Sequence, residues 1–303
     1  MSKVNEKQNA QVTSENLKEF KGRSLGEETM RRLLKNKGAI VGMCFLILLI
    51  VVAIASEFLF DFDNDIIRVQ AENSFAAPSL EHLFGCDQSG RDIFARILYG
   101  ARYSLIIGIG SVSIGLFFGL ILGSLAGFYG GFIDNLVMRA NDILYSIPNI
   151  MIAVVVVSIF GTSTASLLFS LAISAASSFS RITRAAVMQV RGMEYIESAY
   201  AMGLPTWKVI MRHIIPNCLS PIIVQVTLAV GNNIISASSL SFLGVGIPVP
   251  LPEWGAMLAE GRNYIRSAPW MCIFPGLAIM MTVLALNLMG DGLRDALDPK
   301  LKR

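Results

Sequence analysis

The chain has 303 residues, of which 53% are hydrophobic and only 16% are charged, and its formal net charge is +3. Soluble domains carry about 25% charged residues, so this composition leaves too little polar surface to cover a soluble globule of the same length. The small positive charge follows from where the Lys and Arg residues are placed along the chain, and it does not indicate a nucleic-acid-binding surface.

Charged residues are missing from five long runs of the sequence. These runs cover residues 38–56, 103–133, 143–180, 214–252 and 267–290. A bilayer core about 30 Å thick needs roughly 20 apolar residues per helix, so each run is long enough to cross it. The third run contains a predicted turn at residues 161–164, and prolines within 244–252 end the helix of the fourth run near Phe242. The sequence therefore predicts an all-α membrane protein with six transmembrane helices.

Four segments divide the chain in order. Residues 1–37 are a polar tail that ends in a short basic helix, and residues 38–56 are the first span. Residues 57–102 are a loop, and its second half has apolar residues at helical spacing, which predicts an amphipathic helix leading into the second span. Residues 103–303 contain the other five spans.

The second span carries small residues at every fourth position. They are Ser111, Gly115, Gly119, Gly123 and Gly127. Small residues at this interval lie on one face of a helix and allow a neighbouring helix to approach closely. We therefore expect this face to be a helix-packing surface, without a chemical role.

Polar residues also occur within or beside two other spans. Near the start of the third span, Arg139, Asn141 and Asp142 are expected to reach the membrane surface by snorkelling. In the fifth span, Gln225, Asn232 and Asn233 are candidates to line a translocation path, although inter-helix hydrogen bonding is an equal alternative. The four cysteines have no CxxC spacing and predict neither a metal site nor a disulfide.

Positive residues gather in three places that fall on one side of a six-span protein. The positive-inside rule makes this side cytoplasmic, so both termini and the loop after the fourth span are predicted there, and residues 57–102 outside. The positions are Lys18, Lys21, Arg23, Arg31, Arg32, Lys35 and Lys37 in the tail, Arg181, Arg184, Arg191, Lys208 and Arg212 in the loop, and Lys300, Lys302 and Arg303 at the end.

The cytoplasmic loop, residues 183–217, predicts two short helices joined by a sharp bend. Residues 193–202 favour a helix, and Gly203 supplies the left-handed conformation that ends one. Pro205 can open a second helix, and Pro216 is expected to limit it just before the fifth span. Such a bent element, tied to two spans, suits docking to a soluble partner.

This loop resembles the EAA loop of binding-protein-dependent ABC importers. The resemblance is carried by Glu197-Ser198-Ala199, by Gly203 after three more residues, and by Arg212 to Asn217, the form found in peptide and nickel permeases. It implies that the loop is a coupling helix that docks on an ATPase subunit. The implied docking residues are Glu197, Ser198, Ala199, Gly203, Leu204 and Pro205, with His213 and Pro216 at the end of the loop.

Further segments resemble the C-type subunits of oligopeptide and dipeptide permeases. They are residues 84–92, 100–105, 241–244, 252–255 and 291–299. The resemblance covers residues 24–302 and implies the type I ABC importer permease fold in a bacterial inner membrane. It implies import of peptides, with nickel chelates or opine-like solutes as the alternative cargo. An ion-coupled secondary transporter is less favoured, because it would need ionisable residues within the spans.

The resemblance also implies the partners. They are a homologous permease subunit that completes a heterodimer, two ABC ATPase subunits, an extracytoplasmic solute-binding protein and membrane lipid, with no nucleic acid. The sequence contains no G-x-x-x-x-G-K-[ST] motif, which is the loop that cradles phosphates. We therefore expect this chain to be non-catalytic and without a cofactor, and ATP and Mg²⁺ to bind the partner ATPases.

Overall fold

The computed structural model describes residues 25–297, which form helices and loops with one isolated antiparallel bridge between Cys86 and Asp92. The prediction of an all-helical membrane protein is confirmed. The first 24 residues and residues 298–303, with the basic positions predicted there, lie outside the described residues. Among the described residues, five helical stretches are long and apolar enough to cross a membrane: α3 (Lys37–Leu59), α4 (Ile93–Tyr129), α7 (Thr164–Val190), Thr206–Phe242, which includes α10 (Ile215–Phe242), and α12 (Trp270–Leu297).

The third predicted span is bent. It consists of α5 (Gly131–Ser146) and α6 (Asn149–Phe160), and the two helices meet at an angle of 90°. Pro148 lies at the break, and Ile147 before it has extended backbone angles of φ −95° and ψ 124°. A proline disfavours helical angles at the preceding residue and lacks the N–H that would continue the helix. Residues 25–297 therefore contain up to six spans if the bent pair counts as one.

The centre of the bundle is the contact between α4 and α7. Gly115, Gly119, Gly123 and Gly127 are all buried on α4. A Cβ atom on Gly115 would lie 2.9 Å from the backbone nitrogen of Ala176 and 3.1 Å from the carbonyl oxygen of Ala172. Because the glycines leave room for the α7 backbone, the predicted packing face of the second span is confirmed.

Two helices begin or end at residues other than those predicted. The basic helix α2 (Leu25–Leu33) ends four residues early, because Asn36 caps α3 by accepting hydrogen bonds from the N–H groups of Gly38 and Ala39. The amphipathic helix predicted for the second half of the loop 57–102 starts only at Ile93 and is continuous with the second span. Its cap is Asp92, whose carboxylate accepts the N–H of Ala95 at 2.9 Å.

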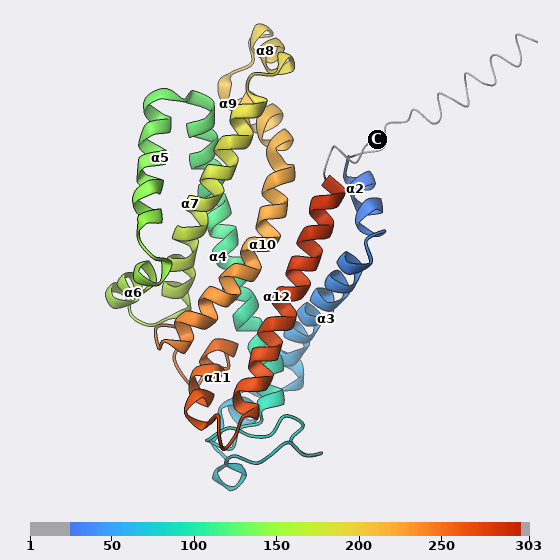
Figure 1. The fold of residues 1–303 in the computed structure, drawn as a ribbon, viewed down its shortest axis with the longest axis vertical. Helices are drawn as coiled ribbons and strands as arrows, with labels where there is room; N and C mark the ends of the chain where they lie inside the picture. The colour runs from blue at the N-terminus through green and yellow to red at the C-terminus, as the bar shows by residue number, and fades with distance from the viewer. Residues whose placement is uncertain (1–24, 298–303) are drawn as a thin grey trace, which may run out of the picture.

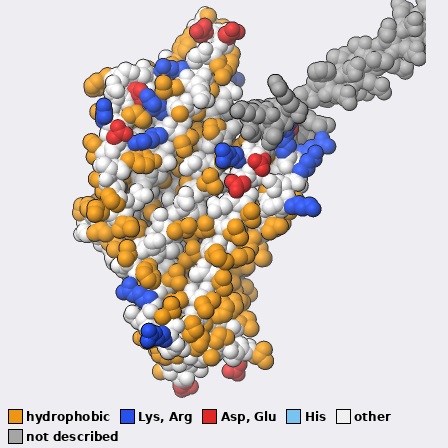
Figure 2. All heavy atoms as spheres, in the orientation of Figure 1, with side chains coloured by type: hydrophobic (Ala, Val, Ile, Leu, Met, Phe, Trp, Pro, Cys, Tyr) orange, Lys and Arg blue, Asp and Glu red, His pale blue; other side chains and the backbone are white. Residues whose placement is uncertain are grey.

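The shorter elements lie at the two ends of the bundle. At one end are α2, the last turns of α12, and α8 (Glu194–Ala201) with α9 (Thr206–Val209) (Figure 1). At the opposite end are the loop after α3 and α11 (Trp254–Gly261). On the face drawn in Figure 2, most charged side chains lie toward the end with α2 and α8, and apolar side chains cover much of α3 and α12. The end with α11 also carries three short elements: η1 (Phe62–Ile67) and η2 (Ala71–Asn73) in the loop after α3, and η4 (Arg262–Tyr264) after α11.

Candidate functional site

The predicted docking loop forms a short helix, α8, that turns one face to the bundle and the other outward. Ile196 and Ala199, three residues apart, are each only 1% exposed. Glu197 and Ser198 are exposed, and the Ser198 hydroxyl donates to the carbonyl of Glu194 at 2.9 Å. The small side chain of Ala199 lets α8 lie against the protein, while Glu197 and Ser198 are free for an outside partner.

Gly203 ends α8 in the predicted left-handed conformation, with φ +76°. The N–H of Gly203 donates to the carbonyl of Tyr200 at 2.8 Å, and the N–H of Leu204 donates to that of Ala199 at 3.3 Å. This pair of bonds is the Schellman motif, which satisfies the last carbonyls of a helix and favours glycine. A Cβ atom on Gly203 would meet nothing within 4 Å. The glycine is therefore required by backbone conformation, and the space beside it is open.

The bend continues into α9, which begins after Pro205. The carbonyl of Pro205 accepts the N–H of Lys208 at 2.9 Å, so the proline starts the helix as predicted. Around this bend three large apolar side chains are exposed: Met202 (74%), Trp207 (64%) and Met211 (62%). Exposed apolar groups gathered on one loop indicate an interaction surface. These three residues were not predicted from the sequence, although large apolar residues in a loop predicted to be cytoplasmic would have indicated them.

Pro216 does not limit the second helix, contrary to expectation. The helical stretch is continuous from Thr206 to Phe242. The link is a π-helical turn, η3 (Ile210–Ile214), in which the N–H of Ile215 donates to the carbonyl of Ile210. Pro216 has no N–H and cannot donate a helical hydrogen bond. The wider π-helical turn before it allows the helix to continue despite this missing bond. The loop and the membrane helix α10 are therefore one mechanical unit.

A second attachment joins the loop to the bundle. The Arg191 guanidinium, just before α8, donates to the carbonyls of Gly127 and Phe128 at 2.8 and 3.1 Å, which satisfies the free end of α4. The rings of Phe128 and Tyr200 lie 6.3 Å apart. The docking loop is thus held by α4 as well as by α7 and α10. His213, at its end, is half-buried, and its carbonyl accepts the side-chain amide of Asn217 at 2.7 Å.

The three polar candidates of the fifth span lie in different environments. The side-chain amide of Asn233 donates to the Ser111 hydroxyl of α4 at 2.8 Å, so this residue makes an inter-helix hydrogen bond. Asn232 is exposed and Gln225 is half-buried, and within residues 25–297 neither side chain has a hydrogen-bond partner. A role for Asn232 and Gln225 in a translocation path stays a prediction.

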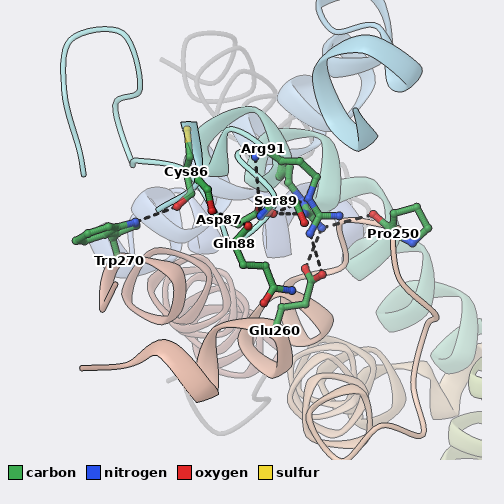
Figure 3. A network of polar contacts seen from close by, with 10 residues as sticks. Cys86, Asp87, Gln88, Ser89, Arg91, Pro250, Glu260 and Trp270 are labelled. Carbon is green, nitrogen blue, oxygen red and sulfur yellow. Dashed lines mark hydrogen bonds and ion pairs between the residues drawn. The ribbon is translucent and has the colours of Figure 1, made fainter. Parts of the chain in front are cut away.

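A buried network of four charges lies at the opposite end of the bundle (Figure 3). Asp87 accepts hydrogen bonds from Arg91 and from Arg96, and Glu260 accepts one from each of the same two arginines, at 2.8 and 3.2 Å. Both arginines are at most 4% exposed. The network joins the loop before α4 and the start of α4 itself to α11, and its two positive and two negative charges compensate one another.

This network was not predicted from the sequence, where residues 87, 91 and 92 are only part of a family pattern. Its carboxylates and guanidiniums are separated by up to 169 residues in the chain. No local pattern connects Arg91 with Glu260, so the pairing follows only from the fold.

Glu253 and Trp254 hold α11 in place. Both belong to residues 252–255, one of the segments that resemble peptide permeases. The Glu253 carboxylate is fully buried and accepts the N–H groups of Gly255 and Ala256 at 2.9 and 2.8 Å, which caps the helix. Burial raises the pKa of Glu253, and these hydrogen bonds act against the increase. The Trp254 indole N–H donates to the carbonyl of Ile97 at 3.0 Å. The segment therefore fixes α11 to the first turns of α4.

Comparison with known families defines the class of this protein. Residues 119–303 match the binding-protein-dependent transport system inner membrane component family, and residues 24–78 match the N-terminal TM domain of oligopeptide transport permease C. The chain belongs to the first of these families. It is a permease subunit of an ABC importer and a multi-pass protein of the bacterial inner membrane. The resemblance to peptide permeases of the C type, inferred from the EAA-like loop and from the further segments between residues 84 and 299, is confirmed.

Individual relatives are similar over nearly the whole chain. The dipeptide transport system permease protein DppC of Alkalihalophilus pseudofirmus is 46% identical, over 91% of this chain and 90% of that protein. The glutathione transport system permease protein GsiD of Pectobacterium atrosepticum is 45% identical, over 91% of each chain. Among solved structures, an inward-facing conformation of the MetNI methionine ABC transporter has a TM-score of 0.56 at 18% identity, covering 67% of this chain and 96% of that chain. The last similarity shows a shared fold.

Proposed function

We propose that this chain is one membrane subunit of an ATP-driven importer of peptides. Two relatives more than 40% identical are named for transport of a dipeptide and of glutathione, itself a tripeptide. The observation that carries the proposal is the loop of α8, Gly203 and α9, whose exposed apolar side chains and open space fit a soluble partner. That partner is an ABC ATPase, which binds ATP and Mg²⁺, while this chain is non-catalytic.

Coupling follows from how the loop is attached. When two ATPase subunits close on ATP, the α8–α9 loop moves with the surface on which it is docked. Because α9, η3 and α10 form one continuous helical stretch, the movement reaches α10 directly. Arg191 passes it to the end of α4 through the carbonyls of Gly127 and Phe128. The rigid contact of α4 with α7 then moves the bundle as a unit and changes access to the path.

The proposed topology has six spans, counting the bent pair α5–α6 as one, with both termini in the cytoplasm. The end with α2, α8 and the last turns of α12 is cytoplasmic, because the described basic residues of α2 and of the α8–α9 loop, such as Arg31, Arg32 and Lys208, lie there. A homologous permease subunit completes the path as a heterodimer, and an extracytoplasmic solute-binding protein delivers the peptide at the end with α11. The polar residues Gln225 and Asn232 are proposed to face that path.

Two substitutions at Gly203 test the docking assignment. Asn adopts the left-handed conformation more readily than other side chains, so Gly203→Asn keeps the bend with little added bulk. Gly203→Trp fills the open space beside it. We expect Gly203→Asn to retain co-purification with the ATPase and uptake of alanyl-alanine in cells, and Gly203→Trp to lose both. Gly203→Trp with normal uptake and an intact complex would refute the assignment.

A further inference from the structure

A polar hollow lies between α5 and α7, near the end of the bundle that carries α8. Its volume is about 440 Å³, and it is lined by Asn135, Met138, Arg139, Asp142, Arg181 and Arg184. None of these residues belongs to α8, to α9 or to the charged network near α11. Ionisable groups gathered within a membrane segment are expensive to keep there and indicate a functional site.

The charges in this hollow do not cancel. Arg184 is fully engaged, because both oxygens of Asp134 accept hydrogen bonds from it. Arg181 and Arg139 share one carboxylate, that of Asp142, at 2.8 and 3.8 Å. Their side chains are 43% and 82% exposed. Two guanidinium groups against one carboxylate leave one positive charge open to the hollow.

Arg181 is held in a defined orientation. Its guanidinium lies over the ring of Tyr145, 4.2 Å from the ring centre. Beside it, the buried amide of Asn141 bonds to the hydroxyls of Ser177 and Ser180, which fixes α5 against α7. The expected snorkelling of Asn141 is therefore wrong, since this side chain is buried. A guanidinium fixed on an aromatic ring is pre-organised to bind a carboxylate through two parallel hydrogen bonds.

Polar side chains continue along the same face of α7. Ser174, Ser178 and Arg181 are four and three residues apart, which places them on one side of the helix. The Ser174 hydroxyl donates to the side-chain oxygen of Asn149, at the start of α6, at 3.1 Å. A surface in contact with lipid tails would be apolar, so this row favours a water-filled path beside α5, α6 and α7.

We propose that the hollow binds the terminal carboxylate of a peptide on its way to the cytoplasm, with Arg181 as the main ligand and Arg139 as the second cation. The inference rests on the proposed function. The single excess positive charge matches one carboxylate, and Asp142 competes for the same arginines, so binding is weak enough for release. A lipid phosphate is the other anion that could reach these arginines, and the experiment separates the two.

The test uses the complete transporter in liposomes, supplied with its binding protein and a labelled tripeptide of two alanines and a C-terminal benzoylphenylalanine. Illumination links the benzophenone to neighbouring C–H bonds, and Met138 in the hollow is a favourable target. We expect a cross-link within residues 135–142 in the wild type. Arg181→Gln should reduce its yield about tenfold, as expected for losing one charged hydrogen bond. Arg181→Lys should restore part of the yield, and Arg266→Gln, at the opposite end, should leave it unchanged.

The outcomes separate the two proposals. Absence of uptake by the wild type would overturn the proposed function and this inference with it. Uptake without a cross-link in the hollow, or a cross-link of equal yield in Arg181→Gln, would overturn only the inference. A yield that follows the content of anionic lipid and not the presence of Arg181 would assign the hollow to lipid headgroups, which also overturns it.

Discussion

The contact between α4 and α7 allows a quantitative prediction at Gly115. In Gly115→Ala the new Cβ would lie 2.5 Å from the Ala175 Cβ and 2.9 Å from the backbone nitrogen of Ala176. These neighbours are backbone or Cβ atoms and cannot rotate away, so the helices must separate. Overpacking of this kind costs about 1–3 kcal/mol, against about 1 kcal/mol gained from the better helix propensity of alanine. We expect a net destabilisation of up to about 2 kcal/mol.

Gly276→Ala in α12 is the matched control. Its Cβ would meet only the end of the Leu258 side chain, at 3.9 Å, so the propensity gain stands alone. Thermal unfolding of the purified complex in detergent, followed by size-exclusion chromatography, compares the two variants. We expect Gly115→Ala to unfold at a lower temperature than the wild type, and Gly276→Ala at the same or a higher one. Equal stability of the two variants would refute the close approach of α4 and α7.

Three further predictions concern other parts of the chain. Arg96→Met should destabilise the protein by about 3–5 kcal/mol, because it leaves the buried carboxylates of Asp87 and Glu260 with one cation instead of two. An unchanged unfolding temperature in this variant would contradict a stabilising role for the network. Burial, with the nearby carboxylates, raises the pKa of the Cys86 thiol to about 11, so alkylation of Cys86 by maleimide at pH 8 should be negligible until the protein is unfolded or the pH approaches 11. Because Cys44 is exposed, the label is located by mass spectrometry, and ready labelling of Cys86 in the native protein would count against this. Asn36→Ala removes the cap of α3 and should cost about 1 kcal/mol in the same unfolding assay; an unchanged transition would show that the cap is not needed.

The elements that depend on local chemistry were predictable from the sequence. The charge-free runs located the membrane helices. The small residues at every fourth position from Ser111 to Gly127 located the packing face of α4. Both signals are repeated along one helix. Gly203 could be assigned a left-handed conformation because a helix-forming stretch stops there. The family resemblance then gave the docking role of the loop, which stays a prediction.

The features that depend on two or more elements were not predictable in the same way. Pro148 explains the break in the third span, but a proline alone does not specify the 90° angle between α5 and α6. Pro216 was expected to end a helix, and the π-helical turn before it keeps the helix continuous. The burial of Asn141 depends on two serines of α7, and the pairing of Arg91 with Glu260 depends on how α11 packs. Such contacts between distant residues leave no periodic signal in a single sequence.

The most direct test of the account is whether the α8–α9 loop touches the ATPase. A photo-activated benzoylphenylalanine placed at Met202, which is 74% exposed at the bend, should cross-link to the ATPase subunit in membranes that contain the whole transporter. The same group at Leu80, 98% exposed in the loop at the opposite end, should not. A cross-link to the ATPase from Leu80, or none from Met202, would contradict the proposed docking of this loop.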